Sequence, residues 1–445
     1  MPLEIFKRKG RSIGVEFLTD KNGVRILPII EDMRKRANAI LIVNLACDDD
    51  FAQINSFVIR KYADIAALGI ISLAKSGNCG EVIIYCGNTS PDDLIDAIKF
   101  QSDITASVIH GPASPVLRDD TALYSAMDHG HVKVYRAELD HSSMFLSYGY
   151  HGRPTLVIDA ETAYQVGRVY KTPNATLTKL ISVTYSSPEP ISSVGVPNKI
   201  SKSKRTDANI EEVDIGTPLS HIMPGLEYGD TVLTGGFSGR FSQVSGLNVR
   251  YVEFGYQYDS LTVFSGADCI LSELAGLYSR INELSCSKCV LCREGSWQLC
   301  TTLQDITAGR ANRDDIALIE DICPIIQAGA LCRFGRDMVL PAFTAVLEYR
   351  EIFQKHVIGK TCLTGRCSGF INYVIDPSLC TGCGECVGSC PNEAIEGKDS
   401  YIHVIDSKLC DKCGDCLTFC PAGAIKVDSE KIRVPKKPVK VGMFR

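Results

Sequence analysis

Eight cysteines near the C-terminus repeat the spacing C-x2-C-x2-C-x3-C-P twice. Three thiolates at this spacing wrap one corner of an iron–sulfur cube, and the fourth, followed by proline, ligates the other cube when one chain carries two such motifs. We therefore expect two [4Fe–4S] clusters that exchange their fourth ligands. The ligand sets are Cys380, Cys383, Cys386 and Cys420 for the first cluster, and Cys410, Cys413, Cys416 and Cys390 for the second. Zinc ribbons also use C-x2-C pairs, but they need neither the third cysteine nor the proline.

A third group, Cys286, Cys289 and Cys292, has the same C-x2-C-x2-C spacing without a nearby fourth cysteine or a trailing proline. Its missing ligand must come from farther along the chain, and Cys332 follows the next predicted helix. We expect a third [4Fe–4S] cluster on these four residues. One alternative is a three-cysteine cluster with an open iron. Another is Cys323 as the fourth ligand, although its position on an apolar helical face favours a core cysteine.

The elements that must position these ligands differ along the chain. Residues 39–43 and 81–86 are predicted to be buried strands, and 50–73 and 92–100 to be helices, which indicates a parallel sheet covered by helices. Residues 182–258 contain proline-rich and short β-like segments. From 268 to 357 the pattern is helical, with Asn312 and Asp315 expected at one helix start.

The C-terminal cysteine motifs belong to an internal repeat, in which residues 375–395 match residues 405–425. A segment of roughly sixty residues buries little core of its own. We therefore expect cluster ligation to supply much of its folding energy.

The composition limits the function classes. With 445 residues the chain is long enough for several domains. A net charge of −5 and a pI near 6.0 argue against nucleic-acid binding. No apolar stretch predicts a membrane span, and no apolar core follows the basic N-terminal residues, as a secretory signal would require. Twenty cysteines, mostly at metal-ligand spacing, indicate a reducing cytoplasm.

Several segments resemble one known family. Residues 286–295 with Cys332 resemble the cluster-binding helical domain of the NADH-oxidising flavoprotein subunit of respiratory complex I. Residues 216–219 and 234–239 resemble that family's β-grasp domain, and residues 152–155 and 161–162 the end of its flavin domain. The appended two-cluster ferredoxin narrows the resemblance to the diaphorase-type β-subunits of soluble multimeric hydrogenases, formate dehydrogenases and electron-bifurcating transhydrogenases.

The resemblance implies a multidomain chain of α/β and α+β parts. The expected domains are a degenerate Rossmann-like FMN/NAD-type domain (1–180), a β-grasp (SLBB-like) domain (181–262), a helical [4Fe–4S] domain (263–355), a zinc-binding linker (356–370), a bacterial-type 2×[4Fe–4S] ferredoxin domain (371–430) and a basic tail (431–445).

The linker before the ferredoxin motifs contains His356, Cys362 and Cys367, which are good tetrahedral zinc ligands. In hydrogenase β-subunits this linker resembles a zinc site completed by a cysteine shortly before the helical cluster motif, and Cys269 fits that position. The alternative is two free thiols and a surface histidine. The further cysteines Cys47, Cys79, Cys86 and Cys300 are expected to be buried small hydrophobes.

The chain departs from the family where flavin binds. The family's glycine-rich FMN segment has only a sparse counterpart at residues 10–14. Its acidic stretch corresponds to residues 43–50, its flavin-side motif to 142–145, and its asparagine motif to 158–162, where both asparagines are lost. FMN is therefore doubtful, and we expect a degenerate scaffold with no catalytic residue and no assigned flavin or NAD contact.

Half of the histidines, His129, His131, His141 and His151, fall within one short stretch. A further metal site is one interpretation, but loops rich in Gly and Asp commonly expose histidines.

These expectations favour an iron–sulfur electron-transfer subunit of a cytoplasmic multi-subunit oxidoreductase. It would relay single electrons through three [4Fe–4S] clusters between partner subunits or ferredoxin, the partner subunits carrying a [2Fe–2S] cluster, a flavin or the catalytic centre. One alternative is a catalytic diaphorase that retains FMN and exchanges hydride with NAD(P)H. The other is a zinc-loaded, non-redox assembly module.

Overall fold

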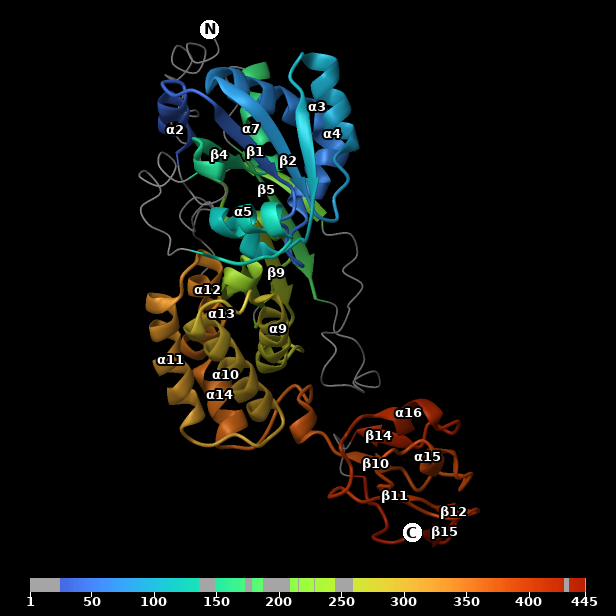
Figure 1. Ribbon diagram of the computed structural model, residues 1–445. Helices are drawn as coiled ribbons and strands as arrows, with labels where there is room; N and C mark the ends of the chain where they lie inside the picture. Colours follow the sequence, from blue (N-terminus) through green and yellow to red (C-terminus); the bar gives the residue numbers. More distant parts are fainter. Residues whose placement is uncertain are drawn as a thin grey trace.

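The computed structural model describes residues 25–135, 149–172, 178–186, 209–214, 216–227, 229–244, 259–427 and 432–444. The segments 10–14 and 142–145, compared above with flavin motifs, and His141 lie outside these residues. Figure 1 shows an N-terminal α/β part above a helical part, and a cysteine-rich C-terminal part beyond the lower end of the helices.

A parallel sheet forms the centre of the α/β part, with the strand order β3-β2-β1-β4. Strand β1 (Ala39–Asn44) lies between β2 (Cys79–Cys86) and β4 (Thr155–Ile158), and β3 (Ala106–His110) forms one edge. Every residue of β1 is buried, because helices cover both faces of the sheet and an apolar run suits that environment. The two strands and the parallel sheet predicted from the sequence are confirmed.

The helices of this part are α2 (Ile26–Met33), α3 (Ile54–Ser76), α4 (Asp92–Gln101), α5 (Asp120–His129) and α7 (Ala160–Lys171), with the short turns η2 (Pro115–Arg118) and η3 (Tyr150–Gly152). The prediction that the long helix begins at Asp50 is wrong. It begins at Ile54, because the Asp49 carboxylate accepts hydrogen bonds from the amides of Phe51 and Ala52 and closes a turn there.

Two glycines let α3 and α7 approach each other closely. A Cβ added at Gly69 would lie 1.8 Å from the carbonyl oxygen of Ala163, and one at Gly167 would lie 1.9 Å from that of Ile65. Gly167→Ala is therefore expected to push the helices apart and destabilise the protein by about 1–3 kcal/mol. Chemical denaturation measures this, with Gly80→Ala as the control, since a Cβ there meets nothing within 4 Å. Equal stability of the two variants would contradict the packing argument.

A second, mixed sheet has the strand order β6-β5-β9-β7-β8. It consists of β5 (Thr178–Tyr185), β6 (Asn209–Asp214), β7 (Thr231–Thr234), β8 (Arg240–Gln243) and β9 (Ser260–Phe264), with α8 (Leu219–Ile222) and η5 (Gly236–Ser238) beside it. Strands β5 and β9 pair in parallel, and the other neighbours pair antiparallel. The short β segments expected within residues 182–258 are confirmed by β6, β7 and β8.

The helical part consists of α9 (Ile270–Leu284), α10 (Val290–Thr307), α11 (Asp315–Gly329), α12 (Arg333–Asp337), α13 (Leu340–Glu348) and α14 (Arg350–Val357). The predicted apolar face of α11, from Ile316 to Ile326, is buried. Asp315 accepts the amide hydrogen of Asn312 at 2.8 Å, as expected, although the N-cap position itself is Asp314.

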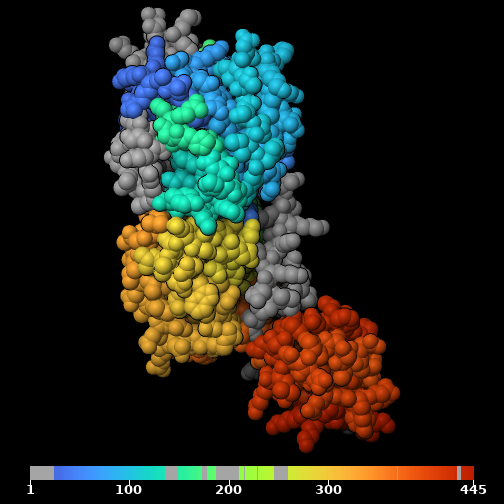
Figure 2. All heavy atoms as spheres, in the orientation of Figure 1, coloured from blue at the N-terminus to red at the C-terminus, as the bar shows by residue number. Residues whose placement is uncertain are grey.

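The C-terminal part pairs short strands of one repeat with strands of the other. β10 (Tyr373–Ile375) pairs with β14 (Ile425–Val427), and β11 (Ile395–Glu396) with β13 (Val404–Ile405). The remaining elements are η8 (Ser368–Phe370), α15 (Glu385–Gly388), β12 (Tyr401–Ile402), α16 (Asp415–Phe419) and β15 (Val439–Lys440). Figure 2 shows this part as a separate lobe beside the base of the helical part.

Candidate functional site

The third cysteine group lies at the turn between α9 and α10. Cys286 and Cys289 are partly buried in this turn, and Cys292 is buried in the first turn of α10. Cys332 caps α12, where its Sγ accepts the amide hydrogen of Gly335 at 3.4 Å. A Cβ at Gly335 would also lie 3.4 Å from the Sγ of Cys292. The start of α12 therefore lies against the first turn of α10.

Cys332, and not Cys323, joins this group in space. Burial raises the pKa of Cys332 far above its ordinary value, and Asp119, Cys292 and Cys286 add to the rise. Burial alone raises the pKa of Cys323 to about 12, with no contribution from the other cysteines. The helical part thus gathers four thiols, Cys286, Cys289, Cys292 and Cys332, beside the α/β part, where η2 contacts α12.

The fourth cysteines of the C-terminal motifs cross over between the repeats. One cavity is lined by Cys380, Cys383, Cys386 and Cys420. Burial raises the pKa of Cys386 to about 11, and the nearby Cys420, Cys380 and Cys383 add to the rise. In the other group, burial raises the pKa of Cys416 to about 12, with further contributions from Cys410, Cys413, Cys386 and Cys390. Such crowded thiols hold their protons, so binding a cluster must release them.

Cys269, His356, Cys362 and Cys367 form a compact quartet whose ligand atoms all lie within 4.8 Å of one another. The Sγ atoms of Cys269 and Cys367 lie 3.4 Å apart, and 3.5 and 3.4 Å from Nε2 of His356. These separations are close to the edge of a tetrahedron with Zn–S bonds of about 2.3 Å. Among the residues that the structure describes, this is the one group of three or more His, Cys, Asp or Glu residues whose ligand atoms all lie within 4.8 Å of one another. The histidines His129, His131 and His151 form no such group there.

The quartet also has the outer contacts of a metal site. Nδ1 of His356 lies 2.9 Å from the carbonyl oxygen of Ile352, which fixes the ring and turns Nε2 toward the thiols. Hydrogen bonds from Cys269 and Cys367 lower the pKa of Cys362, and the same sharing of protons raises that of Cys367. Of these thiols, Cys362 therefore favours the thiolate form even before a cation binds.

The cysteine group of the helical part and the quartet occupy opposite ends of the α9–α10 hairpin. Cys269 precedes α9, and the cysteine turn lies between α9 and α10. Gly369 of η8 packs against Ala308 and Gly309, just after the end of α10. With 18 residues, α10 is about 27 Å long. The C-terminal lobe is therefore attached far from the cysteines of the helical part.

The crevice of the parallel sheet is the ordinary ligand site of such a fold. In open α/β sheets, ligands bind beyond the carboxyl ends of the strands where the strand order reverses, here between β1 and β4. Phosphates bind there to the free amides of helix N-termini.

The chain's own side chains occupy these amides. Both carboxylate oxygens of Asp48 accept from the amide of Asn55 at the start of α3. Oδ1 of Asn55 accepts the amide hydrogen of Ala160, the first residue of α7, at 2.9 Å. Oδ1 of Asp159 accepts that of Thr162 at 2.8 Å. The anchoring positions for a nucleotide phosphate are thus satisfied by acidic and amide side chains.

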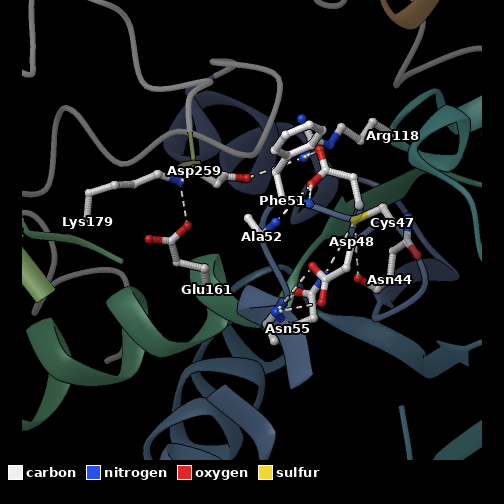
Figure 3. Close-up of polar contacts among 12 residues, drawn as sticks. Asn44, Cys47, Asp48, Phe51, Ala52, Asn55, Arg118, Glu161, Lys179 and Asp259 are labelled. Carbon is white, nitrogen blue, oxygen red and sulfur yellow. Dashed lines mark hydrogen bonds and ion pairs between the residues drawn. The ribbon is translucent and has the colours of Figure 1, made fainter. Parts of the chain in front are cut away.

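A buried ion network covers the same crevice (Figure 3). Arg118 of η2 lies 3.8 Å from Asp49 and 3.4 Å from Asp259. Lys179 of β5 lies 2.7 Å from Asp259 and also pairs with Glu161. Burial lowers the pKa of Arg118, but Asp259 and Asp49 outweigh it and raise the pKa above its ordinary value.

The network joins segments that are far apart in the sequence, and sequence reasoning missed it. Burial raises the pKa of Glu161 to about 7, while Lys179 opposes the rise. Phe51 packs edge-on against Phe237 of η5 at 5.0 Å. The only hint in the sequence was the acidic run Asp48 to Asp50. Carboxylates outnumber cations here, which disfavours a phosphate.

Two iron–sulfur family models match the cysteine-rich regions of the chain. The NADH-ubiquinone oxidoreductase-F iron-sulfur binding region matches residues 274–356, and a 4Fe-4S dicluster domain matches 379–425. The first match contains Cys286, Cys289, Cys292 and Cys332. No helix in the described parts of the chain is both long and apolar enough to cross a membrane.

Curated relatives share parts of the sequence. The chain is 33% identical over 143 residues to the NADP-reducing hydrogenase subunit HndC of Solidesulfovibrio fructosivorans, covering 32% of this chain and 29% of HndC. It is 29% identical over 103 residues to the F subunit of the NADH-quinone oxidoreductase of Streptomyces coelicolor, covering 23% of each. The chain thus spans less than a third of these relatives.

The fold similarity extends over more of the chain. A chain of an NAD+-reducing [NiFe]-hydrogenase in the air-oxidized state superposes with a TM-score of 0.67 at 18% identity. The superposition covers 80% of this chain and 63% of that chain, so the two share a fold over most of this chain.

Proposed function

Because the chain is related to the F subunits of NADH-quinone oxidoreductases and to diaphorase-type hydrogenase subunits, and carries their iron–sulfur region, we propose that it is an electron-transfer subunit of a cytoplasmic multi-subunit oxidoreductase. The observation that carries the proposal is the gathering of twelve cysteines into three groups of four. Each group suits one [4Fe–4S] cluster, which supplies one-electron transfer. Its partners would be other subunits of the complex, with a [2Fe–2S], flavin or catalytic centre, and ferredoxin.

The proposal gives the α/β part a scaffold role. Its Rossmann-like character and the β-grasp character of the second sheet rest on the family resemblance. The satisfied helix N-termini at Asn55 and Ala160, and the acidic network around Asp259, support the loss of FMN and NAD(H) from this crevice. Without flavin the subunit has no group of its own that accepts two electrons as a hydride.

The positions of the cysteine groups support two separate sites at which electrons enter or leave the subunit, one in the helical part and one in the C-terminal lobe. The cysteines of the helical part and the attachment of the C-terminal lobe lie about 27 Å apart along α10. Electron transfer slows exponentially with distance, so the α9–α10 hairpin is a poor path between them. We therefore infer that clusters of partner subunits connect these two sites, or that the C-terminal lobe moves toward the partner subunits.

Zinc is the cation proposed for the quartet of Cys269, His356, Cys362 and Cys367. Its tetrahedral spacing and mixed Cys/His ligands fit a closed structural site. Zinc there would tie the start of α9 to the linker of the C-terminal lobe.

Anoxic purification followed by metal and flavin analysis tests the function. We expect broad iron–sulfur absorbance, about twelve iron atoms and matching sulfide per chain, about one zinc and no released flavin. Stoichiometric FMN together with NAD(P)H-dependent dye reduction would replace the proposal with a catalytic diaphorase. Colourless, iron-free protein would instead indicate an assembly module.

The zinc site predicts a selective loss of one metal. Cys367→Ser removes a buried ligand and should lower the zinc content from about one atom per chain to near zero, with the iron content unchanged. Cys79→Ser is the matched control, since Cys79 lies outside every cysteine group. Elemental analysis of both variants decides; unchanged zinc in Cys367→Ser would refute this ligand set.

A further inference from the structure

His403 is a buried histidine in the C-terminal lobe that the cluster motifs do not account for. Its side chain is only 1% exposed, and its Nε2 has no hydrogen-bond partner among the described residues. It lines the same cavity as Cys380, Cys383, Cys386 and Cys420. Buried polar atoms are nearly always hydrogen-bonded in native proteins, so this nitrogen calls for a partner.

The fold reserves space for this ring. Gly397 packs directly against it, and a Cβ at that position would lie 1.9 Å from Cδ2 and 2.6 Å from Nε2 of His403. Any other residue at position 397 would displace the imidazole. Packing therefore holds the His403 ring in place between β12 and β13, in the lining of the cysteine-lined cavity.

The chemistry of the cavity identifies the missing partner. Sulfide and thiolate sulfurs accept hydrogen bonds and donate none, so a nitrogen that faces them is expected to carry a proton. Burial lowers the pKa of His403, while a hydrogen bond with the backbone of Tyr401 opposes this. A sulfur acceptor next to Nε2 selects the form that carries the proton there.

We propose that Nε2–H of His403 donates a hydrogen bond to a sulfur of the [4Fe–4S] cluster held by Cys380, Cys383, Cys386 and Cys420. The proposal rests on the cluster assignment of the proposed function and adds a positioning residue that tunes one cluster. Hydrogen bonds to sulfur stabilise the more negative, reduced cluster and raise its reduction potential.

The internal repeat makes this contact asymmetric. The position equivalent to His403 in the first repeat is Tyr373. Burial raises the pKa of Tyr373 to about 12, and the nearby Cys416, Cys410 and Cys413 add to the rise, so this phenol lies by the other cysteine group. One cluster thus faces an imidazole and the other a phenol. The two clusters are expected to differ in potential for this reason.

A redox titration of the full chain, monitored by electron paramagnetic resonance, tests the proposal. His403→Phe keeps a ring but loses the donor, and should shift the reduced-to-oxidised ratio of one cluster about tenfold, or about 59 mV for one electron, toward lower potential. The other cluster should not shift. His403→Gln retains an N–H donor and should restore most of the parent potential. Tyr373→Phe is the matched control and should leave the His403-facing cluster unchanged.

Each outcome bears on the proposal. If His403→Phe retains all the iron and neither potential moves, the hydrogen bond does not exist. If both His403 variants lose four irons, the residue acts through packing alone and the proposal fails. If only His403→Phe loses them, and His403→Gln keeps the parent potential, the donor role is supported. Failure of the function itself would appear differently, as missing iron in the parent protein.

Discussion

Cys332→Ala is expected to remove about four of about twelve iron atoms per chain, because in the proposed assignment Cys332 is the fourth ligand of one of three cubes. The other eight proposed cluster ligands lie in the C-terminal lobe, within residues 379–425. The measurement is iron and sulfide per chain after anoxic purification, together with the loss of one of the three low-temperature resonance signals of the reduced protein.

Cys323→Ala is the matched control for this change. Cys323 is as buried as Cys332 and lies in the same helical part, but away from the three cysteines of the turn. It should cost some stability and leave the iron content unchanged. Iron loss in Cys323→Ala, with full iron in Cys332→Ala, would exchange the roles of these two residues.

Asp259→Ala is expected to destabilise the protein by about 1–3 kcal/mol. It removes the carboxylate that Arg118 and Lys179 share and leaves each cation only its second partner, Asp49 or Glu161. Arg118 and Lys179 are 19% and 11% exposed, and both pair with Asp259. The free energy of unfolding of the anoxic protein, measured by chemical denaturation, gives the loss.

Asp50→Ala supplies the comparison. Asp50 pairs with Arg280 at 2.8 Å, but this pair is 42% and 35% exposed, and surface pairs contribute about 0–1 kcal/mol. If both variants lose similar stability, the network over the crevice is no stronger than an ordinary surface pair, and the closed crevice loses its main support.

The metal-ligand groups could be anticipated from the sequence because each depends on local spacing. The turn that holds Cys286, Cys289 and Cys292 is short, and a chain that places three thiols so closely has few other uses for them. The choice between Cys323 and Cys332 needed the structure, since one lies within α11 and the other shortly after its end. Metal occupancy itself stays a prediction for all of these groups.

The crevice could not be predicted, because its closure depends on partners distant in sequence. Asp49, Arg118, Lys179 and Asp259 come from four separate segments, and nothing in their neighbours indicates that they meet. His403 was missed for a related reason. It looks like an ordinary residue before a strand until the fold places it in the lining of the cavity that Cys380, Cys383, Cys386 and Cys420 share.

In the proposed cluster assignment, the exchange of fourth ligands between the two repeats has a consequence for biosynthesis. Cys420 leaves the ribosome well after Cys380, Cys383 and Cys386, so a nascent chain offers only three thiols to the first cube until the second repeat has been made. Cluster delivery to this lobe is therefore expected after translation has passed both repeats. Truncation between the repeats should leave neither half able to mature.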